Sequence, residues 1–455
     1  MYTLSVGRAS KNVALIQAYS VFGVLRALDT FTQLAVRSAD DRSASDKTGI
    51  FLPHMPISID DWPQFAHRGL MLDTARSFIP VDDLLRTLDA MSAVKMNVFH
   101  WHVVDSQSFP IKSEKLPELW KSGAYGPDMV YSAEDVRRIV DYGRKRGIRV
   151  IPEFDTPGHT FAWGLAYPEL SVCANRQPNW QTLDPTNPNT YALLGQLFAE
   201  QAKWFPDASF HMGGDEVNLH CYTDTPRINA YMQSRGLSPT ELVRRYMNRV
   251  VDILANEGKT VTAWEESVLE YGLRPNSSIQ VQVWKGAKNV ADVVRLGYQV
   301  IASPADRWYL DCGRGEWINN AHGEKSWCDP YKDWRVVYTY DPLENLTLSR
   351  HPGSGPADHT VPLSHHPLVA GGEVALWSEQ TDSANLDTQL WPRAAAAAEV
   401  LWSGRRDVVG HERTTREALP RLMALRRRLQ ARHIRVDPIQ MLWCELNPQQ
   451  CEQHE

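Results

Sequence analysis

Short apolar runs alternate with longer segments of helical periodicity along most of the chain, from Arg68 onward. Eight runs have the length of buried strands: Gly69–Asp73, Asn97–Asp105, Ile148–Asp155, Ser209–Val217, Thr260–Glu266, Ile279–Gly286, Gln299–Ser303 and Glu373–Glu379. Apolar residues at three- and four-residue spacing predict helices between them, at Val81–Lys95, Ser132–Arg146, Tyr191–Trp204 and Thr240–Gly258. Eight strands, mostly separated by helices, predict an α/β fold in which the parallel strands close into a (β/α)8 barrel.

The flanking segments have different patterns. Lys11–Val36 has the periodicity of a helix, and the polar segment Ser38–Thr48 that follows is typical of a connector. Trp308–Ala370 is rich in Gly, Pro, Asp and His, which predicts an elaborated loop after the seventh strand. Further helices are expected within Trp391–Trp402 and over Glu412–Arg432.

Composition excludes several classes of protein. The chain has 455 residues, 43% of them hydrophobic and 22% charged, so a large core is available and global disorder is excluded. No window contains the roughly 18 uninterrupted apolar residues of a membrane span. The net charge of −6, without a basic block, argues against binding to nucleic acids or anionic membranes. The 16 Trp outnumber the 12 Phe, which favours a flat-faced ligand such as a sugar.

The cysteines favour an oxidising compartment. The six Cys form an even set without a C-x-x-C motif, and nearest neighbours would pair Cys173 with Cys221, Cys312 with Cys328, and Cys444 with Cys451. Asn276 and Asn345 begin N-x-S/T sequons, which are compatible with a secreted glycoprotein. The segment that begins at Met1 has no signal peptide pattern, which is at odds with export.

Charged, His and Trp residues recur at the carboxyl ends of the predicted strands. Because active sites of (β/α)8 barrels are built there, these ends share one location in space. Strand-end charges alone would explain one or two such residues, but not so many. The residues are Arg76, Asp105, Asp155, His159, Asp215, Glu216, Trp264, Glu265, Trp284, Trp377 and Glu379.

Asp215 and Glu216, in the sequence HMGGDEV, are the sharpest candidates for catalysis. Adjacent carboxylates drive their proton affinities apart, which would leave one proton donor and one anion. Gly213 and Gly214 before them would let backbone or substrate approach closely. The competing interpretation is an acidic pair that binds a cation or solvent.

The histidines allow two interpretations. His100-x-His102 would place both rings on one face of a strand, as in zinc-dependent barrel hydrolases. Later strand ends carry Trp264 and Trp284 where such a site needs further His, so a packed, hydrogen-bonded role is favoured and no metal site is predicted. His159 either caps its loop or holds a carboxylic acid in place, with Asp105 polarising its far nitrogen.

Three indoles, Trp264, Trp284 and Trp377, come from strand ends that converge. They would form a box suited to a sugar face or to a small apolar substituent such as a methyl. Tyr309 and Asp311 follow the seventh strand and add a phenol and a carboxylate to the same rim.

From about Arg68 to about Ser403, the chain resembles family 20 of the glycoside hydrolases, the β-N-acetylhexosaminidases. The resemblance rests on HRGLMLDTARSFIP, KMNVFHWHVVDSQSFP, EFDTPGHT, HMGGDEV, WYLD, GGEVALWSEQTD and LWPRAAAAAEVLWS. The three nearest-neighbour cysteine pairs resemble those of the fungal branch.

The resemblance implies an exo-acting, retaining hydrolase of terminal GlcNAc or GalNAc on chitooligosaccharides or glycans, with no cofactor. The substrate's own 2-acetamido oxygen would be the nucleophile and would form an oxazolinium intermediate. Glu216 would be the general acid/base, Asp215 would orient the acetamido N–H, and Tyr309 would bind its oxygen. The residues implied to bind the sugar are Arg76, Trp264, Trp284, Asp311, Trp377 and Glu379, and those that support Glu216 are Asp105 and His159.

The chain departs from the family in two places. Ser106 stands where relatives commonly carry a second acid. Residues 1–60 correspond to only a remnant of the usual N-terminal α/β domain, in which Lys11–Val36 resembles the final helix and its neighbouring strand, ahead of a catalytic barrel over 61–455. An apolar helix face would then be exposed or used at a subunit contact. An inactive sugar-binding relative and a metal-dependent barrel hydrolase are the alternatives. The resemblance also implies a secreted, vacuolar or lysosomal location and allows a homodimer.

Overall fold

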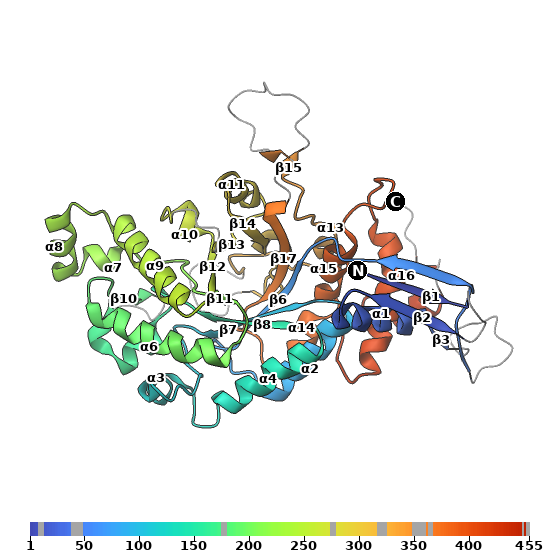
Figure 1. The fold of residues 1–455 in the computed structure, drawn as a ribbon, viewed down its shortest axis with the longest axis horizontal. Coiled ribbons are helices and arrows are strands. Elements are labelled where there is room, and N and C mark those ends of the chain that lie inside the picture. Colours follow the sequence, from blue (N-terminus) through green and yellow to red (C-terminus); the bar gives the residue numbers. More distant parts are fainter. Residues whose placement is uncertain are drawn as a thin grey trace, which may run out of the picture.

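The eight predicted strands form one closed parallel barrel in a computed structural model of the chain (Figure 1). The structure describes residues 1–7, 13–37, 49–173, 180–273, 279–315, 325–347, 361–362, 367–447 and 450–451. The order around the barrel is β6-β7-β8-β11-β12-β13-β14-β17, and β17 closes onto β6. The strands are β6 His67–Asp73, β7 Val98–Val104, β8 Arg149–Phe154, β11 Ser209–His211, β12 Thr260–Trp264, β13 Ile279–Val283, β14 Gln299–Ala302 and β17 Val369–Leu376.

The predicted fold class and all eight strands are therefore confirmed, but several strands end earlier than predicted. β11 ends at His211, although the apolar run continues to Val217. The residues beyond the strand form the loop that carries Asp215 and Glu216. Apolar character continues because this loop is buried in the barrel mouth, not because it is paired in the sheet.

Helices cover the barrel as the periodicity predicted. The four predicted crossover helices are α2 Val81–Ala93, α4 Ala133–Lys145, α6 Pro188–Trp204 and α9 Pro239–Asn256. Ser132 and Ser238 begin α4 and α9 as N-caps in complete capping boxes, which explains where these helices start. Shorter helices lie in the connections: α3 Pro117–Gly123, α5 Phe161–Ala166, α7 His220–Thr223, α8 Pro226–Arg235, α10 Glu266–Leu269, α11 Asn289–Arg295 and α14 Leu386–Leu390.

A small α/β unit lies at one end of the molecule's long axis, with α7 and α8 at the other (Figure 1). Its antiparallel sheet has the order β2-β1-β5, and α1 packs against it. Periodicity alone extends the helix of Lys11–Val36 too far toward the N-terminus, whereas the helix with a neighbouring strand implied by the resemblance is present. Ser20 caps the helix, so the residues before it are free to pair with β1. The elements are β1 Tyr2–Val6, β2 Ala14–Ala18, α1 Val21–Leu34 and β5 Ile57–Asp61.

This unit contacts the amino-terminal end of the barrel, opposite the ends that carry the candidate site. The Arg26 guanidinium donates to the carbonyl oxygens of Met96 and Gly147, just before β7 and β8. Asp61 accepts from the indole N–H of Trp402 at 2.9 Å. Because β5 includes Asp61, the unit ends slightly later than residue 60. The predicted connector Ser38–Thr48 lies outside the described residues.

The outer face of α1 is apolar and exposed, as expected for this segment. Val21 is 74% exposed, Phe22 51% and Leu28 46%. None of the helices in the described ranges is long and apolar enough to cross a membrane.

The described part of 308–370 contains short elements within the predicted loop. It contains α13 Trp334–Thr339 and a parallel pair of two-residue strands, β15 Leu346–Thr347 and β16 Val361–Pro362, and it follows α12 Ala305–Trp308. The predicted later helices are confirmed as α15 Arg393–Ser403 and α16 Thr415–Gln430, and α17 Leu442–Leu446 follows them. The remaining short elements are β3 Val36–Arg37, β4 Ile50–Phe51, β9 Ser171–Val172, β10 Thr182–Leu183 and the 3₁₀ turn Pro168–Leu170.

The three nearest-neighbour disulfides are present: Cys173–Cys221, Cys312–Cys328 and Cys444–Cys451. The second one borders the barrel mouth, because Cys328 lines the pocket described below.

Candidate active site

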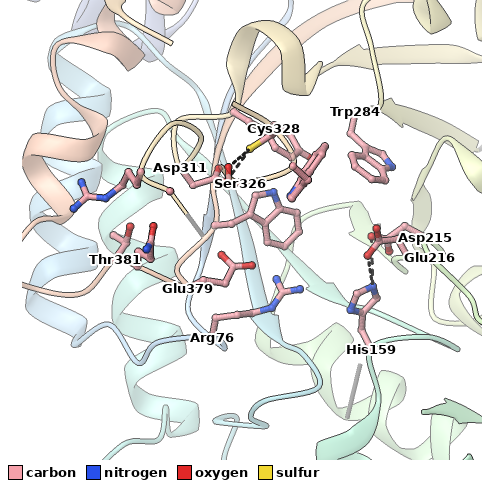
Figure 2. A pocket seen from close by; sticks show the side chains of 16 residues that line it. Arg76, His159, Asp215, Glu216, Trp284, Asp311, Ser326, Cys328, Glu379 and Thr381 are labelled. Carbon is pink, nitrogen blue, oxygen red and sulfur yellow. Dashed lines mark hydrogen bonds and ion pairs between the residues drawn. The ribbon is translucent and has the colours of Figure 1, made fainter. Parts of the chain in front are cut away.

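A pocket opens at the carboxyl ends of the barrel strands, where the sequence places the candidate residues. Figure 2 shows Arg76, Asp311 and Glu379 on one side of it, and His159, Asp215 and Glu216 on the other. Aromatic rings lie between the two groups. The remaining lining residues are Trp284, Tyr309, Arg314, Gly315, Ser326, Trp327, Cys328, Trp377, Gln380 and Thr381.

The loop after β11 places Asp215 and Glu216 in a strained turn. Gly213 has φ +73°, and a Cβ there would lie 1.7 Å from Asp155 Oδ1, so only glycine fits. The N–H of Gly214 donates to the same Asp155 oxygen at 2.9 Å. Glu216 has φ +48°, a left-handed conformation that costs a residue with a side chain about 1–3 kcal/mol. The turn buries Asp215 and leaves the Glu216 side chain 56% exposed to the pocket.

His159 lies among four carboxylates. It follows β8, also has a positive φ of 54°, and is 7% exposed. Its Nδ1 is 3.4 Å from Asp105 Oδ1, and its Nε2 is 3.5 Å from Glu216 Oε2 and 3.7 Å from Asp215 Oδ2. Burial opposes its charge, but Asp105, Asp155 and Asp215 raise the pKa of His159 well above its usual range. The structure thus places His159 where it can hold an acid, with Asp105 behind it.

The pKa values of the two adjacent carboxyl groups are shifted in opposite directions. Burial and the neighbouring Asp155 raise the pKa of Asp215 well above its ordinary value. Contact with His159 lowers the pKa of Glu216, which burial opposes. Asp155, also buried, has its pKa raised to about 6. These opposite shifts favour a protonated Asp215 beside an ionised Glu216.

Arg76 fixes one wall of the pocket. Its Nη2 lies 2.9 Å from Asp105 Oδ2, and its Nε donates to Gln107 Oε1 at 3.1 Å. The guanidinium carbon lies 4.7 Å from the centre of the Trp377 ring. Burial opposes ionisation of Asp105, but Arg76 and His159 hold the pKa of its carboxyl far below the usual range. Asp105 is thus a permanent anion between the arginine and the histidine.

Two carboxyl groups, those of Asp311 and Glu379, line this side of the pocket. Burial and the charge of Glu379 raise the pKa of Asp311 to about 7, and burial also raises the pKa of Glu379. Asp311 Oδ1 is buried and has no hydrogen-bond partner among the described residues. A buried acceptor without a partner is costly, so Asp311 is suited to a ligand that carries hydroxyl donors.

Four aromatic side chains also line the pocket: Trp284, Tyr309, Trp327 and Trp377. Trp284 and Tyr309 stack with centroids 6.2 Å apart, and Trp377 lies 6.1 Å from Tyr309. Trp327 stands edge-on to both stacked rings, and sequence reasoning missed it because no strand end precedes it. Burial raises the pKa of Tyr309 well above its usual range, so its hydroxyl remains a donor.

Trp264, which the sequence predicts in the aromatic box, is not among the residues that line the pocket. It is 1% exposed, packs against Trp377 with centroids 6.1 Å apart, and donates its indole N–H to Glu153 at 2.7 Å. It therefore supports the aromatic wall from below.

The His-x-His pair is packed and hydrogen-bonded, as favoured from the sequence. Both ring nitrogens of His102 face carboxylates, with Nδ1 2.7 Å from Glu153 and Nε2 2.8 Å from Asp105. His100 lies between Glu373 and Glu153 at 2.7 and 2.9 Å. With both nitrogens of His102 engaged, its ring has no free lone pair for a metal ion. The partner acids Glu153 and Glu373 were missed because they lie within apolar strand runs.

Of the two sequons, Asn276 lies outside the described residues. Asn345 is partly buried, and its side-chain N–H donates to the carbonyl of Ala287 at 2.9 Å. The nitrogen that would carry a glycan is therefore engaged within the protein.

Comparison with known families agrees with this geometry. The model of the family "Glycosyl hydrolase family 20, catalytic domain" matches residues 65–405, which include the whole barrel and every candidate catalytic residue. A second model, "beta-acetyl hexosaminidase like", matches residues 1–34 in the small N-terminal unit.

Individual relatives match over nearly the full chain. A beta-hexosaminidase of Emericella nidulans is 34% identical over 99% of this chain and 77% of its own length. The human beta-hexosaminidase subunit beta is 37% identical over 97% of this chain and 72% of its own length. The solved structure of a Flavobacterium johnsoniae chitobiase superposes with a TM-score of 0.78 at 31% identity, covering 95% of this chain. This chain spans only 60% of that bacterial protein.

Proposed function

The chain belongs to family 20 of the glycosyl hydrolases, and on that basis we propose that it removes terminal, non-reducing β-linked N-acetylhexosamine from chitooligosaccharides or glycans. The observation that carries the proposal is the meeting of Asp215, Glu216 and Tyr309 in one pocket. An anion, an acid/base and a phenol donor are the groups that a neighbouring acetamido group needs in order to act as nucleophile.

In the first step, the acetamido oxygen attacks C1 while Glu216 protonates the departing glycosidic oxygen. The C1–O bond to the leaving group breaks, and a cyclic oxazolinium ion forms. Asp215 accepts a hydrogen bond from the acetamido N–H and stabilises the positive charge that develops on the acetamido group. The Tyr309 hydroxyl donates to the acetamido oxygen and holds it beneath C1.

In the second step, Glu216 takes a proton from water, and the resulting hydroxide attacks C1 from the face that the leaving group left. The C1–O bond to the acetamido oxygen breaks, which restores the acetamido group. Two inversions at C1 give overall retention. Arg76, Asp311 and Glu379 bind ring hydroxyls, and Trp284 and Trp377, with Trp264 behind them, enclose the acetyl methyl and the sugar face.

We expect substrate binding to shift the shared proton from Asp215 to Glu216, the general acid. A sugar in the pocket displaces water from Glu216, and this raises the pKa of its carboxyl. The acetamido N–H at the same time gives Asp215 a hydrogen bond that favours its anion. Both changes favour a proton on Glu216 and an anionic Asp215 in the substrate complex.

The inactive sugar-binding alternative is not favoured. It rested partly on Ser106, but Asp105 still contacts Arg76 and His159, and it also accepts from the Ser106 backbone N–H at 2.6 Å. The missing second acid thus leaves the partners of Glu216 in place.

The test is hydrolysis of paired nitrophenyl glycosides of GlcNAc and GalNAc by the purified chain and by its Glu216→Gln variant. We expect turnover by the wild type and a loss of about 10²- to 10⁴-fold in kcat/KM in the variant, the usual contribution of a general acid/base. The ratio of the two substrates gives the sugar preference. Equal rates for wild type and variant would contradict the proposal.

We further propose a secreted, vacuolar or lysosomal location, supported by three disulfides, which form in oxidising compartments. A homodimer is supported by the exposed apolar face of α1 and by a human relative that is named as a subunit. Sedimentation of the purified chain over a range of concentrations tests the dimer, and a monomer throughout would contradict it.

A further inference from the structure

Acids and histidines alternate in a continuous buried series inside the barrel. Successive side chains approach within 3.0, 2.7, 2.9, 2.7 and 2.8 Å. They come from strands β6, β17, β7 and β8 and from the residue after β7, and all are at most 6% exposed. We call them the His–carboxylate chain; in order, they are His67, Glu373, His100, Glu153, His102 and Asp105.

Stability does not account for this arrangement. The interior of a (β/α)8 barrel is ordinarily filled by branched aliphatic side chains. Replacing a buried ion pair by apolar residues is often neutral or stabilising, because desolvation offsets the attraction between the charges. A barrel that keeps six such groups in its core departs from the packing rule, and departures of this kind are expected at functional sites.

Within the His–carboxylate chain, Glu153 has the most side-chain contacts. Its Oε2 accepts from His102 Nδ1 at 2.7 Å and lies 2.9 Å from His100 Nε2. Its Oε1 accepts the Trp264 indole N–H at 2.7 Å and lies 3.1 Å from His211 Nδ1. Burial opposes its ionisation, but the surrounding histidines hold the pKa of Glu153 well below its usual range.

These contacts lead to both walls of the pocket. On one side, His102 contacts Asp105, which lies 3.4 Å from His159, and His159 lies 3.5 Å from Glu216. On the other side, Trp264 packs against the pocket residue Trp377. Glu153 itself touches neither the pocket nor Glu216, so its effect on the reaction must pass through these neighbours.

His102 carries the connection to Asp105 as a doubly protonated ring. Its two nitrogens face carboxylates at 2.7 and 2.8 Å, and each contact needs an N–H on the histidine. Burial opposes this charge, but Glu153 and Asp105 raise the pKa of His102 well above its usual range. Without the carboxylate of Glu153, the ring would become a neutral tautomer that can turn, and Asp105 would lose its fixed donor.

We propose that Glu153 is a positioning residue for the acid–base step, because it holds His102 in the orientation and protonation state that align Asp105, His159 and finally Glu216. The inference rests on the proposed hydrolysis and adds to it a residue that touches no substrate. Other charged groups lie near this part of the His–carboxylate chain: Asp155 two residues after Glu153, Glu373 beyond His100, and Arg76 beyond Asp105. None of them contacts His102 Nδ1, so none replaces Glu153.

The test compares two leaving groups in a Glu153→Gln variant. An N-acetylglucosaminide with a dinitrophenolate leaving group needs no proton from Glu216, whereas one with an unactivated aglycone does. For the unactivated substrate, we expect kcat/KM to fall about 10- to 100-fold, the usual loss when an orienting partner is removed. For the dinitrophenyl substrate, the fall is less than about threefold, because the acid no longer limits the step.

The matched control is Glu200→Gln. Glu200 is also a buried glutamate, 8% exposed, but it lies in α6 and accepts from Ser113 Oγ and from the Glu114 and Lys115 N–H groups. We expect this variant to change kcat/KM by the same factor for both substrates. Equal losses on both substrates in Glu153→Gln, or no loss on either, would overturn the proposal. A wild type that hydrolyses neither substrate would overturn the proposed function as well.

A second measurement does not depend on whether a Glu153 variant folds. In ¹⁵N-histidine spectra of the wild-type chain, assigned with a His102→Gln variant or by contacts to Trp377, His102 should keep both ring N–H protons at pH values where an ordinary histidine has lost one. The His102 ring lies 4.8 Å from Trp377, edge-on, which identifies its signals. A neutral His102 ring at pH 6 would contradict the proposal.

Discussion

At the scale of single residues, strain and unpaired polar atoms mark the site. Glu216 and His159 both have left-handed backbone conformations, each at a cost of about 1–3 kcal/mol. Asp215 Oδ1 and Asp311 Oδ1 are buried and have no hydrogen-bond partner among the described residues. Departures of this kind are expected at functional sites. The strained turns direct the Glu216 and His159 side chains toward the pocket, and the unpaired oxygens of Asp215 and Asp311 can accept hydrogen bonds from a ligand.

The adjacent carboxyl groups lead to a prediction about pH. The wild-type pair holds one proton between the lowered pKa of Glu216 and the raised pKa of Asp215, so kcat/KM should have a broad plateau. An Asp215→Asn variant keeps only the lowered pKa of Glu216. Its acid form is lost at lower pH, and we expect the basic limb of kcat/KM to move toward acid.

The measurement is kcat/KM from pH 4 to 9 for both proteins, together with Asp224→Asn as the control. Asp224 is a carboxylate outside the pocket lining, so its substitution should leave the profile unchanged. A basic limb that stays in place in Asp215→Asn would contradict the shared proton.

The sequence predicted residues at strand ends better than residues inside strands. Asp105, His159, Asp215, Glu216 and Tyr309 meet as expected because the barrel topology brings their strand ends together. Glu153 and Glu373 could not be recognised, because within an apolar run their role depends on contacts between strands far apart in sequence. Trp264 was placed in the lining because a strand end does not tell whether a side chain lies at the surface of the pocket or beneath it.

At the scale of elements, the loop after β11 decides where the acids lie. A substitution of Gly213 by Ala puts a Cβ against Asp155 and requires an L residue at φ +73°. We expect the free energy of unfolding to fall by about 3 kcal/mol or more, because overpacking adds to backbone strain. Activity should fall with it, because the Asp215–Glu216 turn must move.

Gly258→Ala is the matched control for this prediction. Gly258 has the same φ of +73°, but a Cβ there meets nothing within 4 Å, so only the backbone cost of about 1 kcal/mol remains. Urea denaturation of both variants measures the difference. Equal destabilisation would show that the contact with Asp155 is unimportant.

Element boundaries were predicted best where the local signals are strong. The serine caps of α4 and α9 and the regular apolar spacing place those helices within a few residues. The error at Lys11–Val36 has a physical cause: Val13, Leu15 and Ile16 fit a helical stripe, yet Ser20 caps the helix after them. Pairing with β1 then overrides local periodicity, as tertiary contacts often do.

At the scale of the whole molecule, the N-terminal unit and the pocket lie at opposite ends of the barrel strands. Arg26 holds the unit to the loops before β7 and β8, whereas the reacting groups follow the carboxyl ends of the strands. The division into 1–60 and 61–455 remains a proposal, with the small sheet extending to Asp61.

The disulfides lead to a prediction about stability. Cys173 and Cys221 are 48 residues apart, whereas Cys444 and Cys451 are 7 apart. Because a cross-link restricts the unfolded chain more when its loop is longer, replacing the first pair by Ala should cost about 1.5–2 kcal/mol more than replacing the second. Urea denaturation of the two double variants measures this, and equal losses would contradict the entropic explanation.

In the proposed mechanism, the substrate's own acetamido oxygen is the nucleophile, aligned by Asp215 and Tyr309 while Glu216 supplies the proton. The most direct test is kcat/KM for a series of aryl N-acyl-β-glucosaminides whose acetyl methyl carries zero, one, two or three fluorines. Fluorine withdraws electrons from the carbonyl and weakens it as a nucleophile. We expect a steep, progressive fall in kcat/KM along the series, and a rate independent of fluorination would contradict a nucleophilic acetamido group.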